Sequence, residues 1–100
     1  MLKADLQQKE EKNNLSELRQ QAGSWLRARR IELNLSQREL ANRVNMEYYT
    51  FISQIEAGRG RVPPDRLRDW AEALEMDKRE FAIQLMKYYD HHSYEMIFES

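Results

Sequence analysis

A chain of 100 residues is long enough for one domain with a modest core. It contains no cysteine, which excludes disulfides and thiol nucleophiles and suits a reducing cytoplasm. Its apolar runs are short and its N-terminal segment lacks the apolar stretch of a signal peptide, so we expect a soluble cytoplasmic protein with no membrane partner.

The formal net charge of −1 conceals an uneven distribution along the chain. Residues 1–23 carry four basic and four acidic groups, and residues 24–68 carry nine arginines against five acidic groups. Residues 69–100 carry three basic against eight acidic groups. Positive charge is thus concentrated in the middle of the chain, as is typical of a surface that faces nucleic acid phosphates, and the acidic part can point away.

Residues 1–13 are polar and mixed in charge, which predicts a flexible N-terminal arm. Apolar residues at helical spacing then predict a first helix over about 15–33. Asn14 with Glu17 could cap its start, and Gly23 weakens the pattern and could mark a kink.

Residues 35–58, LSQRELANRVNMEYYTFISQIEAG, predict two short helices joined by a tight turn. Ser36 followed by Glu39 is a capping box, so a helix begins at the next residue after Ser36. Asn34 and Asn45 are expected to end helices, because Asn tolerates the left-handed backbone conformation. The inward faces of the two short helices are predicted to consist of Leu40, Ala41 and Val44, and of Phe51, Ile52 and Ile55.

Two consecutive prolines permit a helix to start but not to continue, which places the next helix near residues 64–74. Asp77 and Glu80 form a further capping pair, so another helix is expected over about 78–89. The inward residues of these two helices are predicted to be Leu67, Trp70, Ala71, Leu74, Phe81, Leu85 and Tyr88.

The tail of residues 90–100 carries more aromatic and aliphatic surface than a disordered end would. Either it folds back on the core, or it pairs with a second subunit by two-fold symmetry, which we favour. The candidate dimerisation residues are Tyr89, Tyr94, Ile97 and Phe98.

The sequence offers only weak candidates for a catalytic or metal-binding site. Asp90, His91 and His92 are adjacent, and adjacent side chains splay apart on a helix, so we expect no metal site there. No nucleophile motif or phosphate-cradling loop is present, and neither catalysis nor a cofactor is expected.

Several motifs occur together between about Leu26 and Leu85. They are Arg30, LSQ at 35–37, the Leu40–Ala41 pair, ISQIEAG at 52–58, the basic loop RGRVP at 59–63 and RLRDWAEALEM at 66–76. In combination they resemble the lambda-repressor-like, or Cro/C1-type (XRE), helix-turn-helix family of DNA-binding regulators. The resemblance implies an all-α, five-helix DNA-binding domain over residues 14–89, between the arm and the tail.

The family places the second of its two short helices in the major groove of double-stranded DNA. Base readout is expected from amide and hydroxyl side chains on its outer face, namely Tyr49, Thr50, Ser53 and Gln54. Phosphate contacts are expected from Gln37, Arg38, Arg43, Tyr48, Arg59 and Arg61, with Gln37 assigned by the resemblance. The resemblance also implies a structural ion pair between Arg30 and Glu56, since a buried charge needs a partner.

Two features depart from the family pattern. Asn45 and Glu75 stand where the family usually has Gly, and Glu would be strained in a left-handed conformation, so a modified helix end is expected near Glu75. The segment from Met46 to Phe51 is one residue longer than the common pattern, which lengthens the turn or the start of the reading helix.

The sequence therefore predicts a transcriptional regulator, expected to be a repressor that binds an inverted-repeat operator as a homodimer. The alternative is an antitoxin-like or adaptor module that grips a protein partner through its hydrophobic tail. An enzyme is a more distant alternative and would require an activity that depends on His91 or His92.

Overall fold

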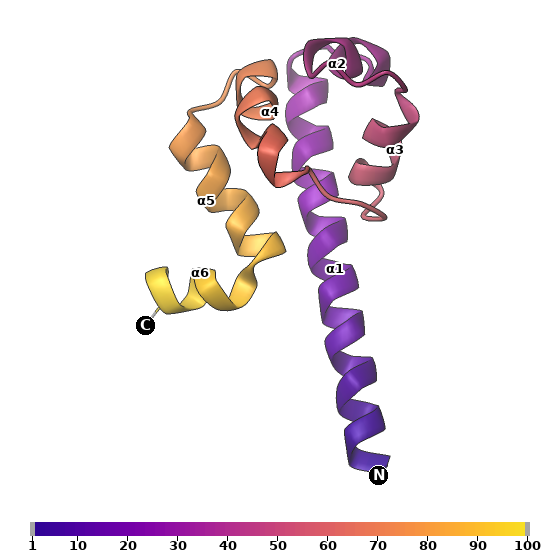
Figure 1. The fold of residues 1–100 in the computed structure, drawn as a ribbon, viewed down its shortest axis with the longest axis vertical. Coiled ribbons are helices and arrows are strands. Elements are labelled where there is room, and N and C mark those ends of the chain that lie inside the picture. The colour runs from indigo at the N-terminus through magenta and orange to yellow at the C-terminus, as the bar shows by residue number, and fades with distance from the viewer. Residues whose placement is uncertain (1, 100) are drawn as a thin grey trace.

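The computed structural model describes the backbone of residues 2–99 and the side chains of residues 14–99. Its elements in chain order are α1 (Leu2–Glu32), α2 (Gln37–Arg43), α3 (Thr50–Glu56), the 3₁₀ helix η1 (Pro64–Arg66), α4 (Leu67–Ala73), α5 (Lys78–Tyr89) and α6 (His91–Phe98) (Figure 1). Residues 2–99 contain no strand, so the all-α prediction is confirmed. No helix within this range is both long enough and apolar enough to cross a membrane.

Helix α1 is the axis of the molecule, and α3 and α5 both contact it (Figure 1). In Figure 1, α3 lies on one side of the C-terminal half of α1 and α5 on the other, while the N-terminal half projects beyond them. The helix begins at Leu2, so the predicted cap at Asn14 is wrong and the segment expected to be an arm is helical from that point. Residues 2–13 contain neither Gly nor Pro and are rich in Leu, Lys, Glu and Gln, which favour helix continuation.

The tail expected after α5 forms a sixth α-helix, which the five-helix prediction missed. Asp90 leaves the helical conformation, with φ −136° and ψ 61°, and α6 then turns sharply away from α5 (Figure 1). Helix α5 has the predicted bounds, and the Asp77 side chain accepts the backbone N–H of Glu80 at 3.0 Å.

The core lies where α1 to α5 meet, and its fully buried large side chains come from all of these helices and from the loop before η1. They are Leu26, Leu40, Val44, Ile52, Val62, Trp70, Leu74, Phe81 and Leu85. Burying one such side chain contributes about 1.5–3 kcal/mol. The predicted inward position of Phe51 is wrong, because this side chain is 49% exposed. The buried stripe of α3 is instead Ile52, Ile55 and Glu56, which turns Phe51 toward the outer edge of the helix.

Three non-glycine residues end helices in the left-handed conformation. They are Asn34 at φ 57°, Asn45 at φ 56° and Glu75 at φ 54°. In each case the residue that follows donates its N–H to the carbonyl oxygen of the residue five positions earlier. Met46 donates to Ala41 at 2.9 Å, and Met76 donates to Ala71 at 2.9 Å.

The predicted modified end at Glu75 is therefore wrong, since the helix closes in the ordinary way despite the strain of about 1–2 kcal/mol. Arg29 offsets this strain by donating to the carbonyl oxygens of Leu74 at 2.9 Å and Glu75 at 3.0 Å. A guanidinium thus satisfies the carbonyls that the end of α4 leaves unpaired.

Helix α1 runs unbroken through Gly23, which is buried under the C-terminal end of α3. A Cβ atom at Gly23 would overlap the carbonyl oxygen of Glu56 and would lie 2.7 Å from that of Ile55. Gly23 is thus required by the close approach of two helix backbones rather than by a kink.

We expect Gly23→Ala to destabilise the fold by about 2 kcal/mol or more through overpacking. This loss exceeds the roughly 1 kcal/mol gained from the higher helix propensity of Ala. Urea unfolding measures the difference, with Gly60→Ala as the control, because a Cβ at Gly60 would meet only the Ile55 side chain at 3.7 Å. Equal stability of the two variants would contradict the close-approach interpretation.

Candidate nucleic-acid interface

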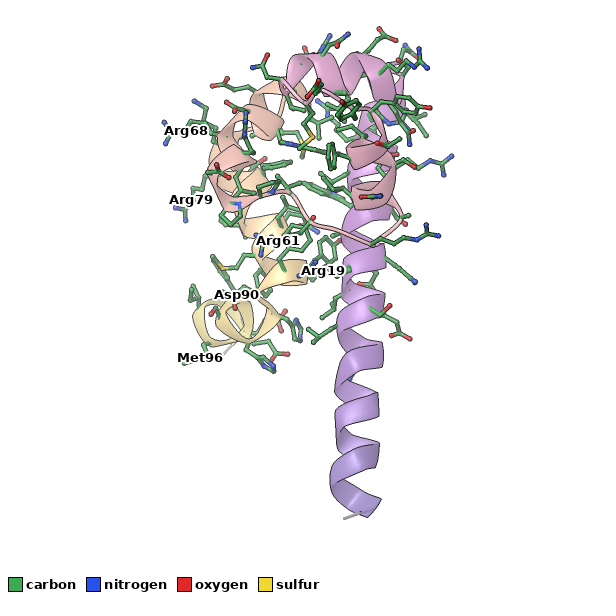
Figure 2. All side chains as sticks on the ribbon, turned by 45° about the vertical axis from the view of Figure 1, so that its right-hand side comes forward. Arg19, Arg61, Arg68, Arg79, Asp90 and Met96 are labelled. Atoms are coloured by element: carbon green, nitrogen blue, oxygen red, sulfur yellow. The ribbon has the colours of Figure 1, made fainter. Side chains whose placement is uncertain are left out.

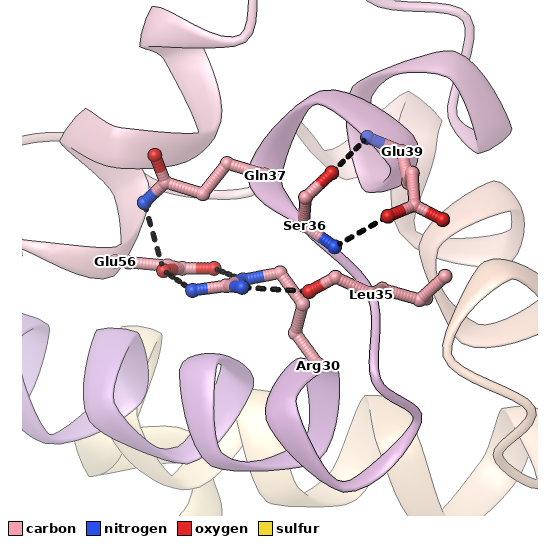
Figure 3. Close-up of polar contacts among 6 residues, drawn as sticks. All are labelled: Arg30, Leu35, Ser36, Gln37, Glu39 and Glu56. Carbon is pink, nitrogen blue, oxygen red and sulfur yellow. Dashed lines mark hydrogen bonds and ion pairs between the residues drawn. The ribbon is translucent and has the colours of Figure 1, made fainter.

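Helices α2 and α3, joined by residues 44–49, form the helix-turn-helix that the sequence predicts. The Ser36 hydroxyl accepts the N–H of Glu39 at 3.0 Å, and the Glu39 carboxylate accepts the N–H of Ser36 at 3.1 Å (Figure 3). The predicted capping box is confirmed. The hydrogen bond from the Ser36 backbone lowers the pKa of the Glu39 carboxyl. This hydrogen bond therefore stabilises the fold fully at a pH above the ordinary pKa of the carboxyl, and the stabilisation is lost as the pH falls through the lowered pKa.

The predicted ion pair between Arg30 and Glu56 is present, and both residues are only 8% exposed. Arg30 Nε donates to one carboxylate oxygen of Glu56 at 2.7 Å, and Nη2 donates to the other at 3.0 Å. Nη1 of Arg30 donates to the carbonyl of Leu35 at 2.7 Å (Figure 3). The network therefore fixes the end of α3 against both α1 and the segment that leads into α2.

Gln37, predicted to bind a phosphate, completes this network from outside. Its Nε2 donates to Glu56 Oε1 at 3.2 Å, and the side chain is half-buried (Figure 3). The first residue of α2 is thereby tied to the last residue of α3, which agrees with the role of bracing the reading helix that the resemblance implies for Gln37 beside phosphate binding.

The four residues predicted to read bases are all exposed. Thr50, Ser53 and Gln54 lie on the outer face of α3, and Tyr49 directly precedes the helix. Within residues 14–99, the side chains of Thr50, Ser53 and Gln54 form no hydrogen bond to another part of the protein. Their donors and acceptors therefore face outward, while Ile52 and Ile55 on the opposite side anchor the helix in the core.

Three aromatic rings surround the start of α3, and all are largely exposed. The Tyr48 ring lies 6.3 Å from the Phe51 ring, and the Arg38 guanidinium lies 4.8 Å above the Tyr49 ring. Helix α3 begins at Thr50, and Tyr49 before it has φ −63° and makes no side-chain cap hydrogen bond.

The four arginines predicted to bind phosphate fall into two groups. Arg38 and Arg59 are exposed, and Arg59 directly follows Gly58, whose φ of 80° ends α3. Arg43 instead donates to the carbonyl of Ala73 at 3.0 Å and lies 3.6 Å from the Glu75 carboxylate. Arg61 is likewise occupied, because its Nε donates to the carbonyl of Val62 at 3.1 Å.

Tyr89, one of the residues predicted for dimerisation, is half-buried and contacts other parts of its own chain. Its hydroxyl accepts the backbone N–H of Val62 at 3.2 Å, and its ring lies 4.4 Å from the Arg61 guanidinium and 5.3 Å from that of Arg19. Figure 2 shows Arg19 and Arg61 close together between α1 and the end of α5. Burial raises the pKa of the Tyr89 hydroxyl. The helical spacing of Tyr89 from the core residue Leu85 was the available sequence signal.

The histidines of α6 form local contacts. His91 Nε2 lies 2.9 Å from the Glu95 carboxylate, one helical turn away, and its Nδ1 lies 3.3 Å from the carbonyl oxygen of Lys87. Among residues 14–99, no three His, Cys, Asp or Glu side chains gather closely enough to hold a metal ion.

A family model described as helix-turn-helix matches residues 26–81, which is more than half of the chain. The matched segment contains α2, α3 and α4 together with the Arg30–Glu56 pair. No curated protein matches the chain.

We expect Glu56→Ala to destabilise the protein by about 3–5 kcal/mol, because the Arg30 charge would remain buried without its partner. Glu32→Ala is the matched control, since it removes the exposed pair with Arg29 at 3.1 Å, for which about 0–1 kcal/mol is expected. Urea unfolding of both variants gives the comparison. A Glu56→Ala protein as stable as the control would rule out a structural role for the pair.

Proposed function

The chain belongs to the Cro/C1-type helix-turn-helix family of DNA-binding regulators, and from this premise we propose that it is a sequence-specific repressor. It binds an inverted-repeat operator as a homodimer, with α3 in the major groove, and represses by occluding a promoter. The observation that carries this proposal is the outer face of α3. Its polar side chains form no hydrogen bond within residues 14–99, while the opposite face of the helix is fixed by the Arg30–Glu56 pair and by buried isoleucines.

The proposed base contacts follow from the chemistry of that face. The Gln54 amide can pair in bidentate fashion with adenine, and the hydroxyls of Thr50 and Ser53 can donate to or accept from several base edges. Tyr49 adds a hydroxyl at the start of the helix, beneath the Arg38 guanidinium. Together these groups would supply the sequence preference.

The proposed phosphate contacts lie on either side of α3. Arg38 on α2, Tyr48 in the connection and Arg59 after α3 are exposed and can reach a sugar-phosphate backbone. Gln37, Arg43 and Arg61 take part only if their internal contacts to Glu56, Ala73 and Val62 are exchanged or shared. We therefore assign the larger share of phosphate binding to Arg38 and Arg59.

The proposed dimer uses α6. This helix has no buried residue, and its large apolar side chains Met96, Ile97 and Phe98 are 81%, 61% and 45% exposed. Tyr94 packs on Phe98 with ring centroids 5.0 Å apart, and Tyr94, Ile97 and Phe98 share one helical face that a second copy of α6 would cover. If the chain is instead an adaptor or an antitoxin, the same surface of α6 would bind a different protein.

Arg59→Ala is expected to weaken binding to every duplex and to reduce the slope of log affinity against log salt concentration by about 0.9, the loss of one phosphate contact. Arg79→Ala removes the same charge from α5 on the side of the molecule away from α3, and should leave the slope unchanged (Figure 2). Fluorescence anisotropy over a series of salt concentrations measures both. Identical slopes for the two variants would contradict the phosphate role of Arg59.

Ile97→Asp is expected to convert the dimer into a monomer, because it places a charge in the apolar surface of α6. Ala82→Asp introduces the same charge at an exposed position of α5 and should leave the dimer intact. Sedimentation velocity of the full chain distinguishes the two states. A dimer that survives Ile97→Asp removes α6 as the interface, and a defined complex with another protein that Ile97→Asp abolishes would favour the adaptor.

A further inference from the structure

Phe51 is a large apolar side chain on the reading helix that the core does not use. The other apolar residues of α3 are almost completely buried, with Ile52 at 0% and Ile55 at 5%, whereas Phe51 is 49% exposed. The helix is therefore well packed, and the exposure of Phe51 results from its direction on the helix and not from a loose contact.

The position of Phe51 places it beside the residues proposed to read bases. It precedes Gln54 by three residues, a spacing that makes two side chains neighbours on a helix surface. Its ring also lies 6.3 Å from that of Tyr48, so the two rings form an apolar surface at the start of α3. Gln54 and this apolar surface would thus face adjacent positions of one ligand.

The surroundings of this apolar surface are positively charged and polar. Arg38 lies over the neighbouring Tyr49 ring and Arg59 is exposed directly after α3, against one exposed acidic residue of the connection, Glu47. This charge complements a polyanion, and the one apolar group that a DNA base pair presents in the major groove is the 5-methyl group of thymine. An aromatic side chain can contact that methyl group favourably.

We propose that Phe51, supported by Tyr48, is a specificity-determining residue that contacts the 5-methyl group of a thymine next to the base read by Gln54. This inference rests on the proposed function and specifies its substrate, a half-site in which a thymine lies beside an adenine. The contact with the methyl group requires no hydrogen bond. It can therefore select thymine over cytosine at a base pair that the amide and hydroxyl side chains of α3 do not contact.

Deletion of single methyl groups from the operator tests the proposal. An operator is selected from random duplexes with the full chain, and each thymine is then replaced in turn by deoxyuridine, which lacks only the methyl group. One replacement in each half-site is expected to weaken binding by the wild-type chain by about three- to tenfold, the magnitude expected for one buried methyl group.

The Phe51→Ala variant should bind the thymine and deoxyuridine operators with equal affinity. Ile31→Ala is the matched control, because it removes a similarly exposed apolar side chain, 50% exposed, from α1, and it should retain the full discrimination. Thermal unfolding checks that both variants remain folded, which the partial exposure of both side chains favours.

The inference is overturned if no deoxyuridine replacement weakens wild-type binding, or if Phe51→Ala loses affinity for both operators equally while retaining their difference. Either outcome leaves DNA binding intact and removes only the role of Phe51. Failure of the selection to enrich any duplex is a separate result, which overturns the proposed function and this inference together.

Discussion

The buried pair of Arg30 and Glu56 is the interaction on which the rest of the interface depends. Removing two charges from water costs several kcal/mol for each, and that cost is offset only where geometry and hydrogen bonding are nearly ideal. Both carboxylate oxygens and the guanidinium are satisfied, by each other, by Gln37 and by the carbonyl of Leu35. A shift of α3 relative to α1 would break some of these hydrogen bonds and leave a buried charge without a partner. The pair therefore fixes the orientation of the outer face of α3.

Much of the fold could be predicted from local sequence signals. The capping box at Ser36, the left-handed end at Asn45 and the bounds of α5 depend on neighbours within a few residues, and all are present. The exposure of Phe51 could not be predicted, because it depends on which face of α3 meets segments distant in the sequence. For the internal position of Tyr89, the sequence offered only its helical spacing from Leu85, and the partner Val62 is distant. At Glu75 a local rule failed, since Arg29 from α1 compensates the strain.

The arginines illustrate why charge counting only partly predicts a binding surface. Arg29 and Arg43 donate to carbonyl oxygens at the end of α4, and Arg61 lies over the ring of Tyr89. A guanidinium has several donors and a flat apolar face, so it can close helix ends and cover aromatic rings as readily as it binds phosphate. Several arginines of this segment therefore stabilise the fold, and fewer of them are free to bind phosphate than the charge count of the sequence suggests.

The missing side chain at Gly23 lets two helix backbones meet. At this point the backbone of α1 lies directly against the carbonyls of Ile55 and Glu56, while the Arg30–Glu56 pair joins the same two helices through side chains. The outer face of α3 is thus connected, through one backbone contact and one ion pair, to the helix whose N-terminal part projects beyond the rest of the molecule (Figure 1).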